Sequence, residues 1–553
     1  MTTPYAQHVN TKQTPQSEPI PGSQQVPNSA GGFAFAVDDW TRLDRFLVLG
    51  SEGGSYYASE RKLTRENAAC VERCLKADGA RTVARIVEVS DKGRAPKNDP
   101  AILALAMCAK LGDDATRKVA RAALPKVCRI GTHLLHFAEY VQTFGGWGRG
   151  TQDAVARWYN DKPVEDLTYQ VIKYQSRDKW SHRDLLRLSK PRGAQDSRDA
   201  LYHWITKGWP SIGDVPHPDP LLRPVWAFEQ LKRATTAKEA ATLIREYKLP
   251  RECVPTQLLT DPGVWDALLH SGIGLTALLR NLATMTRVGL LAPLASATAE
   301  VQRRLVDREA IKRARVHPIA VLAALLTYRQ GRSVRGSGTW TPVMAIADAL
   351  DAAFYLAFDA IEPTGKRTLL ALDVSGSMSN GECAGVPGLT PRVGSAAMAL
   401  VTAAVEPQHA FVAFTSGAPG EWVGGRSQYA GYNCALSELT ISPRQRIDDV
   451  CQQTVRLPMG GTDCSLPMLW AQARKIPIDT FIVYTDSETW AGQIHPVQAL
   501  RQYRQAMGIG AKLIVVGMVA NEFSIADPSD GGMMDVVGFD TAAPAVMADF
   551  ARA

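Results

Sequence analysis

The chain has 553 residues, and its 62 Lys and Arg against 55 Asp and Glu give a formal net charge of +7. Because single domains usually span about 100–200 residues, we expect at least two domains. The composition, 45% hydrophobic and 21% charged, excludes a mainly disordered, collagenous or coiled-coil chain. From Lys366 onward there are 13 basic and 17 acidic residues, so the first 365 residues carry 49 − 38 = +11. This basic N-terminal part indicates a polyanionic partner.

Residues 1–30 are rich in Thr, Gln, Pro and Ser, which predicts a disordered tail. They contain no apolar segment behind a basic start, so we expect no secretory signal. The apolar stretch 393–405 falls short of the roughly 20 residues needed to span a bilayer, and we expect no membrane association. Nine scattered cysteines without a Cys-x-x-Cys pair favour reduced thiols and a cytoplasmic location.

Residues 31–364 show apolar residues at helical spacing in short blocks, for example 101–111, 115–124, 134–144, 268–282 and 319–328. Turn residues such as Gly112-Asp113-Asp114 separate the blocks. More than 300 residues of helical hairpins exceed one bundle. We therefore predict stacked antiparallel helix pairs of the α-solenoid kind.

Residues 365–553 show a different pattern, in which short apolar runs alternate with helical blocks. The runs are 368–373, 409–414, 479–485 and 512–519, and the helical blocks are 392–405, 443–455, 465–475 and 496–507. Such alternation predicts an α/β domain with a doubly wound parallel sheet. Ligands of these sheets bind at the carboxyl ends of the strands.

Oxygen-bearing side chains follow the predicted strands of this domain. The run 368–373 ends in a loop with alternate Asp and Ser residues, a Gly-flanked Thr follows later, and the run 479–485 ends in a second carboxylate. The set is Asp373, Ser375, Ser377, Thr462 and Asp486. Carboxylate and hydroxyl oxygens suit a hard divalent cation, Mg²⁺ or Mn²⁺. The local alternative is a turn held by Asp and Ser hydrogen bonds.

The order of these motifs resembles the metal-ion-dependent adhesion site of von Willebrand factor A domains. In that family the cation usually bridges to a carboxylate of a partner and performs no chemistry. Glu488 could be proposed as a hydrolytic base, but an exposed strand-end carboxylate is the preferred interpretation. We therefore expect no catalytic residues and no enzymatic activity.

The densest basic run lies at residues 173–192, with seven Lys and Arg against two Asp. The candidate RNA-binding residues of this run are Lys173, Arg177, Lys179, His182, Arg183, Arg187 and Lys190. The i,i+4 spacings predict that Lys173 and Arg177 share one helical face, and that Lys179, Arg183 and Arg187 share another. Ser181 and Asp184 predict a helix start with a capping box, with Trp180 as the preceding apolar residue. The alternative is an ordinary solvated helix face, although a second basic cluster at 303–315 favours nucleic acid.

Several long strings resemble the Ro autoantigen family, which joins a TROVE module to a von Willebrand A domain. They include Gly146-Trp-Gly-Arg149, Trp158-Tyr-Asn160, the run from Trp180 to Ser189, and Gly460-Gly-Thr-Asp-Cys-Ser-Leu-Pro467. The resemblance covers nearly the whole chain after about Phe33.

The resemblance implies a ring of HEAT-like helical repeats closed by the A domain, in a monomeric protein. It implies that the central hole takes single-stranded 3′ ends of misfolded or precursor RNA and that the basic outer surface binds small noncoding Y RNAs. Lys173 and Arg177 match the family's Lys and Arg that are important for Y RNA. Lys190 replaces a histidine of animal members, and lysine cannot stack as imidazole does.

The resemblance further suggests a bacterial member that works in ribosomal RNA maturation or RNA decay with an exoribonuclease such as polynucleotide phosphorylase. The leading hypothesis is thus an RNA-binding ribonucleoprotein scaffold. The alternative is a cation-dependent protein-adhesion scaffold, and a metal-dependent nuclease ranks last.

Overall fold

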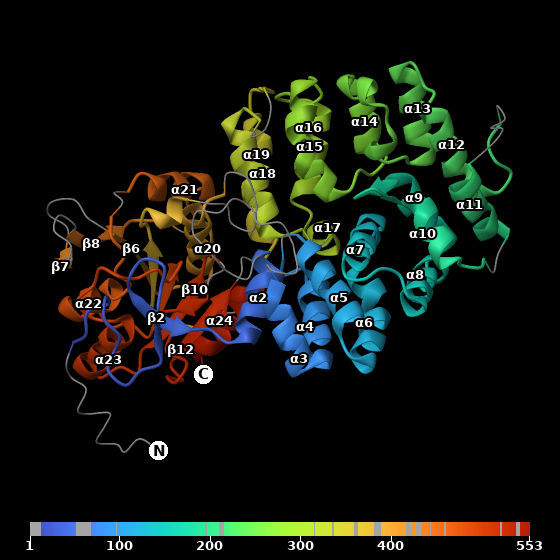
Figure 1. Cartoon of the computed structure of the whole chain (residues 1–553). Helices are drawn as coiled ribbons and strands as arrows, with labels where there is room; N and C mark the ends of the chain where they lie inside the picture. The colour runs from blue at the N-terminus through green and yellow to red at the C-terminus, as the bar shows by residue number, and fades with distance from the viewer. Residues whose placement is uncertain are drawn as a thin grey trace. The chain divides into compact units, whose positions relative to one another are not determined.

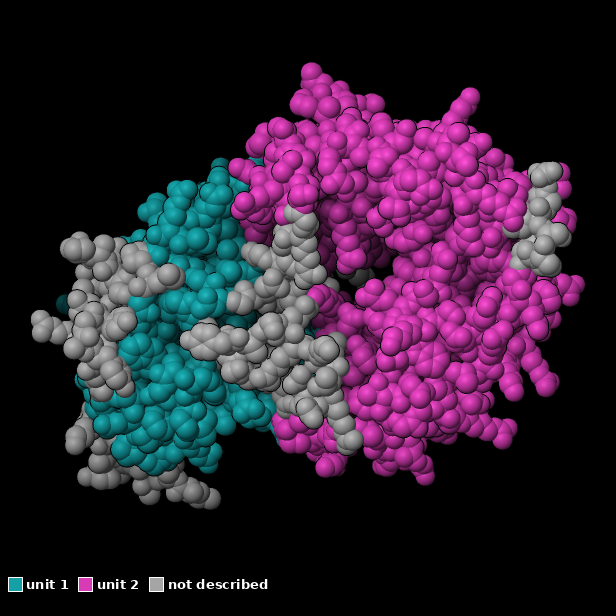
Figure 2. All heavy atoms as spheres, turned by 45° about the horizontal axis from the view of Figure 1, so that its top comes forward, with its two compact units in different colours: residues 1–62, 358–553 teal, residues 63–357 magenta. Residues whose placement is uncertain are grey.

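The computed structural model describes residues 13–552, except for 51–67, 96, 194–195, 209–214, 315, 334–336, 359–362, 381–388, 416–421, 427–432, 443, 458–459, 520–521 and 538–541. The chain forms two compact units, one of residues 1–62 together with 358–553 and one of residues 63–357 (Figure 2). We call them the sheet unit and the helical unit. Over the described residues, no helix is long and apolar enough to cross a membrane.

The helical unit is a series of short helices joined by tight turns (Figure 1). Its α-helices are α3 (Ala69–Ala77), α4 (Gly79–Asp91), α5 (Asp99–Leu111), α6 (Asp114–Val127), α7 (Gly131–Thr143), α8 (Arg149–Asp161), α9 (Val164–Lys173), α10 (His182–Ser189), α11 (Asp196–Lys207), α12 (Arg223–Leu231), α13 (Ala237–Tyr247), α14 (Pro262–His270), α15 (Leu275–Arg287), α16 (Ser296–Leu305), α17 (Arg308–Arg313), α18 (Pro318–Gln330) and α19 (Met344–Leu356). Short 3₁₀ helices lie at Pro220–Leu222, Arg251–Cys253 and Thr256–Thr260.

Packing in the helical unit is mostly between helices that are close in sequence. Helix α5 packs against α4, α6 and α7, and α13 packs against α12 and α14. This nearest-neighbour pattern is that of a solenoid, as predicted from the helical blocks. The predicted block 268–282 is two helices, because Ser271–Gly274 separates α14 from α15.

The two ends of the helical series touch each other through a buried histidine. His317 Nδ1 accepts a hydrogen bond from Ile319 N at 3.1 Å, which leaves Nε2 to donate to the carbonyl oxygen of Arg94 at 3.1 Å. Arg94 follows α4 and His317 caps α18, so the series of helices curves back on itself within this unit.

The sheet unit contains a seven-stranded sheet in the order β12-β10-β9-β5-β6-β8-β7. Its strands are β5 (Thr368–Asp373), β6 (His409–Thr415), β7 (Trp422–Arg426), β8 (Asn433–Leu439), β9 (Thr480–Thr485), β10 (Lys512–Gly517) and β12 (Met533–Val537). The five strands from β12 to β6 are parallel, whereas β8 and β7 are antiparallel additions at one edge. The prediction of a parallel core is confirmed, and the antiparallel edge is an addition to it.

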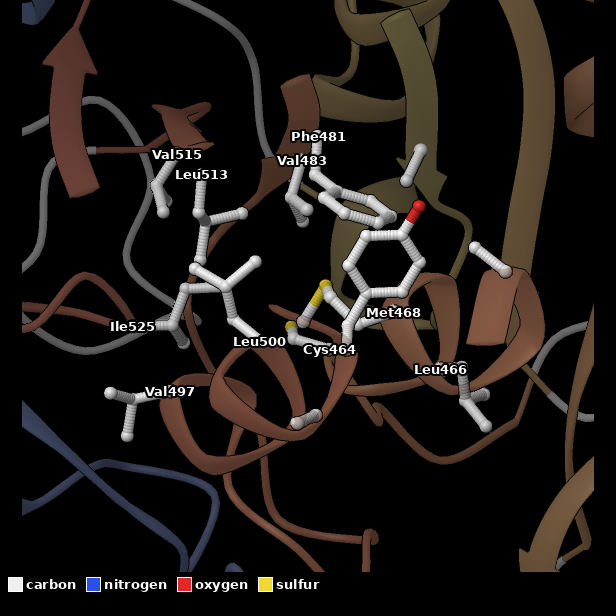
Figure 3. Close-up of a cluster of buried hydrophobic side chains, with 14 of the residues drawn as sticks. Cys464, Leu466, Met468, Phe481, Val483, Val497, Leu500, Leu513, Val515 and Ile525 are labelled. Atoms are coloured by element: carbon white, nitrogen blue, oxygen red, sulfur yellow. The ribbon is translucent and has the colours of Figure 1, made fainter. Parts of the chain in front are cut away.

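Helices cover both faces of this sheet. They are α20 (Pro391–Val405), α21 (Ile447–Val455), α22 (Leu466–Ala473), α23 (Pro496–Met507) and α24 (Ala542–Arg552), with a 3₁₀ turn at Ser377–Ser379. Alternate strand residues such as Phe481, Val483 and Leu513 pack with α22 and α23 in one buried cluster (Figure 3). On the other face, the Tyr484 hydroxyl lies 3.2 Å from Thr402 Oγ1 of α20. The α/β layering therefore follows from the period-two alternation of the strands.

The N-terminal segment is part of the sheet unit. Strands β1 (Gln25–Pro27) and β2 (Phe33–Ala36) form a small sheet with β11 (Phe523–Ser524), and α2 (Asp39–Leu49) packs on β12. Within α2, the fully buried Arg45 pairs with Asp535 of β12 at 2.9 Å. The prediction of a disordered tail is therefore wrong for residues 13–30, while residues 1–12 lie outside the described residues. Composition misled because the apolar surface that this segment covers is supplied by the other end of the chain.

Candidate nucleic-acid interface and metal centre

A short β-hairpin carries the first residues of the basic run. Helix α9 ends at Lys173, after which β3 (Ser176–Arg177) pairs with β4 (Trp180–Ser181). The two-residue turn between them, Asp178-Lys179, has φ values of 50° and 67°. Positive φ at both turn positions is typical of a type I′ hairpin turn. The predicted helical faces of Lys173 with Arg177, and of Lys179 with Arg183, are therefore wrong.

Contacts with α7 hold this hairpin in place. Asp178 Oδ2 contacts His136 Nδ1, whose Nε2 lies 3.3 Å from Asp99 Oδ1. The Trp180 indole N–H donates to Glu139 Oε2 at 2.8 Å. A positive φ at a residue other than glycine costs of order 1 kcal/mol or more and persists only where surrounding contacts enforce it. The contacts of Asp178 and Trp180 with α7 hold the turn in this conformation.

Helix α10 continues the basic run with a capped start. Ser181 is its N-cap, and both hydrogen bonds of the capping box with Asp184 are present, which confirms the sequence prediction. Arg183 and Arg187 are exposed one turn apart, and Lys190 is exposed as the left-handed C-cap with φ of 45°. The acidic N-terminus and basic C-terminus of α10 also match the helix dipole.

Five basic side chains of the hairpin and of α10 are exposed together, and we call them the basic surface: Arg177, Lys179, Arg183, Arg187 and Lys190. Of these, Arg177 has a weak ion pair with Asp178 at 3.8 Å. Lys173 is half-buried beside this surface, with its Nζ 5.3 Å from the ring centre of Tyr169 and 5.1 Å from that of Tyr174. Lys173 also lines a cavity of about 390 Å³ between α9, α13 and α15.

His182 lies in the interior, so the structure removes it from the set of surface candidates. Its Nδ1 is 2.6 Å from the hydroxyl of Tyr159, and the side chain packs edge-on against that ring. A Cβ on Gly131 would lie 3.1 Å from His182 Nε2, so this position needs a very small residue. Burial lowers the pKa of His182 from its ordinary 6.5 to about 4, which keeps the imidazole neutral at physiological pH.

The predicted metal ligands meet at the carboxyl ends of two neighbouring parallel strands. Asp373 ends β5 and Asp486 directly follows β9, its neighbour in the sheet. Asp373 accepts hydrogen bonds from Ser375 N at 2.9 Å and from Thr485 Oγ1 at 2.6 Å, and the hydroxyls of Ser375 and Ser377 are 2.7 Å apart. Hydrogen bonds thus link Asp373 to Ser375 and Thr485, and Ser375 to Ser377, at the edge where α/β sheets bind ligands.

Thr462 joins this group through its loop. Its carbonyl oxygen accepts from Trp490 N at 3.1 Å and from Ala491 N at 3.0 Å, which ties its loop to the one that carries Asp486. Thr462, Asp373 and Asp486 are all buried.

The charge balance of this group fits a divalent cation. Burial, together with the charge of Asp486, raises the pKa of Asp373 from 3.8 to about 7. Two buried carboxylates that repel each other are stabilised by a positive ion between them. No cluster of three or more His, Cys, Asp or Glu side chains suited to a metal occurs among the described residues, so hydroxyl oxygens would have to complete the coordination.

Two family models match successive parts of the chain. The family model described as the TROVE domain matches residues 26–209 and 245–326, and the one described as the Ro60 vWA domain matches residues 367–551. The chain belongs to the Ro60 family. This confirms the sequence prediction of a TROVE module joined to a von Willebrand A domain.

Two relatives are similar to the chain over nearly its whole length. The RNA-binding protein RO60 of Deinococcus radiodurans is 45% identical over 98% of both chains. The RNA-binding protein RO60 of Caenorhabditis elegans is 35% identical and covers 95% of this chain and 90% of its own. The crystal structure of the Deinococcus radiodurans RO (RSR) protein matches with a TM-score of 0.69 and 44% identity, covering 93% of this chain and 99% of that one.

The candidate cation site of this Ro60 family member has neighbours that the sequence reasoning missed. The Thr485 hydroxyl donates a hydrogen bond to Asp373, and the position of Thr485 at the end of a predicted strand could have identified it from the sequence. Arg392 of α20 is buried and donates to Ser379 Oγ and to the Leu457 carbonyl oxygen, at 3.2 and 2.9 Å. Glu488 was expected to be exposed but is buried, and its Oε2 accepts from Ala30 N at 3.0 Å. No local pattern marks a contact between residues 30 and 488.

Parts of the second basic cluster contact the helical unit's own backbone and acidic groups. Arg304 donates to the carbonyl oxygens of Leu269 and Ile273, and Arg303 pairs with Glu300 at 2.7 Å. Arg315 lies outside the described residues. The basic surface around α10 is therefore the stronger candidate interface.

The neutral state of His182 predicts how stability depends on pH. Because the pKa is lower in the folded protein, the stabilising contribution of neutral His182 is complete above pH 6.5 and is lost as pH falls toward 4. By pH 5 the loss reaches about 2 kcal/mol. In His182→Asn, which keeps an acceptor for Tyr159 but cannot titrate, the drop in unfolding free energy from pH 7.5 to 5 should be smaller by this amount. Urea unfolding followed by circular dichroism measures it, and equal drops in both proteins would contradict the assignment.

Proposed function

We propose that this protein is an RNA-binding ribonucleoprotein scaffold without catalytic activity of its own. The observation that carries the proposal is the basic surface, which has five exposed cations on a hairpin held by α7 and on the helix that follows it. Lys and Arg side chains bind RNA chiefly by neutralising phosphates. Both relatives described above bear the name RNA-binding protein, which supports the same class of partner.

In this proposal the basic surface, with Lys173 beside it, binds small noncoding Y RNAs. We further propose that the helical unit binds the single-stranded 3′ ends of misfolded or precursor RNAs, in the central hole that the family resemblance implies. The bound RNAs are thereby presented for quality control, ribosomal RNA maturation or decay. The protein acts as a cytoplasmic monomer.

The sheet unit adds a cation-dependent contact to a protein partner. Asp373, Ser375, Ser377, Thr462 and Asp486 hold Mg²⁺ or Mn²⁺, and the ion offers a remaining position to a carboxylate of the partner. The partner we propose is an exoribonuclease such as polynucleotide phosphorylase. In this proposal Glu488 is a structural carboxylate, whose Oε2 accepts a hydrogen bond from Ala30 N.

The salt dependence of RNA affinity tests the RNA-binding proposal. Each phosphate neutralised contributes about −0.7 to −0.9 to the slope of log K against log salt concentration, so a surface of five cations predicts a slope of roughly −3 to −5. The measurement is fluorescence anisotropy of a labelled RNA hairpin with a single-stranded 3′ tail, at several salt concentrations and at constant Mg²⁺. A slope near zero would contradict the proposal.

A second candidate function is a cation-dependent adhesion scaffold whose helical unit does not primarily bind RNA. The buried pair Asp373 and Asp486, surrounded by hydroxyls, favours it. Affinity purification with and without a chelator separates the two functions. Recovery of RNA in both conditions supports the first, whereas protein partners that are lost on chelation and absence of RNA support the second.

A further inference from the structure

The docked N-terminal segment lies directly against the loops that carry two of the proposed cation ligands. Thr462 is in the loop before α22, and Asp486 begins the loop between β9 and α23. The distance between these two loops decides whether the side-chain oxygens of Thr462 and Asp486 can reach one cation, because coordination distances tolerate only a few tenths of an ångström.

Gln16 connects these two loops. Its Nε2 donates to Asp463 Oδ1 at 2.7 Å, next to Thr462, and to the Ile494 carbonyl oxygen at 2.9 Å. Its Oε1 accepts from Thr489 Oγ1 and from Gly492 N at 3.2 Å. Gln16 is fully buried, and both amide hydrogens and the amide oxygen are used. One side chain thus adds four hydrogen bonds to the backbone hydrogen bonds that Trp490 N and Ala491 N donate to the Thr462 carbonyl oxygen, and so helps to hold the loop of Thr462 against the loop of Asp486.

Other residues of the segment bind the same loops. Asn28 Nδ2 donates to the Thr489 carbonyl oxygen at 2.7 Å, and Ala30 N donates to Glu488, two residues from Asp486. Gly32 passes so close that a Cβ there would lie 2.0 Å from the Thr489 carbonyl oxygen. Only glycine at position 32 therefore lets the segment lie this close to the loop that carries Thr489.

We propose that Gln16 is a positioning residue for the cation site, which makes the N-terminal segment an integral part of that site. The inference rests on the cation site proposed above. Side chains that orient metal ligands from outside the coordination sphere are needed for full affinity, and their loss costs about 10–100-fold in metal binding. Removal of the Gln16 amide leaves the backbone hydrogen bonds between the two loops and all five ligand oxygens in place, but it removes the four side-chain hydrogen bonds that fix how the loops pack on each other.

The test compares Mn²⁺ affinity, measured by electron paramagnetic resonance, in the full chain and in Gln16→Met. Methionine keeps the length of the side chain but cannot make the four hydrogen bonds. We expect the dissociation constant for Mn²⁺ to rise by about 10–100-fold. The matched control is Gln25→Ala, because Gln25 anchors the same segment through His495 and the Ile20 backbone and contacts neither Asp463 nor Thr489. The control should lower the melting temperature without changing Mn²⁺ affinity.

The outcomes separate this inference from the proposal on which it rests. If the wild-type chain binds Mn²⁺ and Gln16→Met binds it equally well while melting earlier, Gln16 is only structural and the inference is overturned. Equal loss of Mn²⁺ affinity in Gln25→Ala overturns it as well, since docking in general would then be responsible. If the wild-type chain does not bind Mn²⁺, the cation site itself is wrong and the inference is overturned with it.

Discussion

Replacing four cations of the basic surface with alanine should weaken RNA binding severely and make it less sensitive to salt. The variant carries Arg177→Ala, Lys179→Ala, Arg183→Ala and Arg187→Ala. Because each lost phosphate contact removes nearly one unit of slope, log K against log salt should become shallower by about 3, with at least a tenfold loss of affinity at low salt. Fluorescence anisotropy with a labelled RNA hairpin measures both quantities.

The matched control removes the same charge from other exposed positions of the helical unit. Lys76, Lys118, Lys126 and Lys238 are exposed on α3, α6 and α13. Their replacement by alanine removes the same four positive charges as the first variant, so its RNA affinity measures the effect of the protein's overall electrostatic field alone. If the control variant loses as much affinity as the first, the basic surface has no special role and the assignment is wrong.

Asp486→Asn should abolish the stabilisation of the sheet unit by Mg²⁺. A ligand that binds only the folded state stabilises it by about 2.7 kcal/mol when present at 100 times its dissociation constant. Wild-type protein should therefore melt several degrees higher with Mg²⁺ than with chelator. The variant should show no such difference. Without metal, it should be more stable than wild type, because the charge that raises the pKa of Asp373 is gone.

Differential scanning calorimetry measures these shifts, with Asp448→Asn as the control. Asp448 is also buried in the sheet unit but lies on α21, where it pairs with Arg446 at 3.2 Å. That variant should keep the Mg²⁺ shift. A shift that persists in Asp486→Asn would show that any stabilising cation binds elsewhere.

The sequence predicted those parts of the candidate sites that depend on local patterns. The capping box at Ser181 follows from residue types three positions apart, and Asp373 and Asp486 follow from apolar runs that end in carboxylates. Because parallel neighbouring strands end at the same edge, the convergence of β5 and β9 follows from the predicted fold.

Long-range contacts account for most of what the sequence did not predict. The spacing of Lys173 and Arg177 suits a helix, yet α9 ends at Lys173, and the hairpin turn at Asp178 is held by His136 of α7. His182 was expected at the surface because its neighbours are basic. Its burial depends on Tyr159 and Gly131, each from a different helix.

The N-terminal segment depends even more strongly on long-range contacts that the sequence does not reveal. A stretch rich in Gln, Pro and Ser has too few apolar residues to fold alone, which is why composition predicts disorder. The amides of Gln16 and Asn28 instead donate to acceptors more than 440 positions away, in the loops of the sheet unit. Polar residues that complete a network elsewhere in the chain carry no local signal.

Mapping of RNA crosslinks on the full chain tests the central proposal most directly. The protein is irradiated while bound to an RNA hairpin with a single-stranded 3′ tail, and the crosslinked peptides are identified by mass spectrometry. We predict crosslinks within residues 169–190, at the end of α9, the hairpin and α10, and their loss in the variant with four alanines. Crosslinks confined to residues 365–553 would contradict the assignment of RNA to the helical unit.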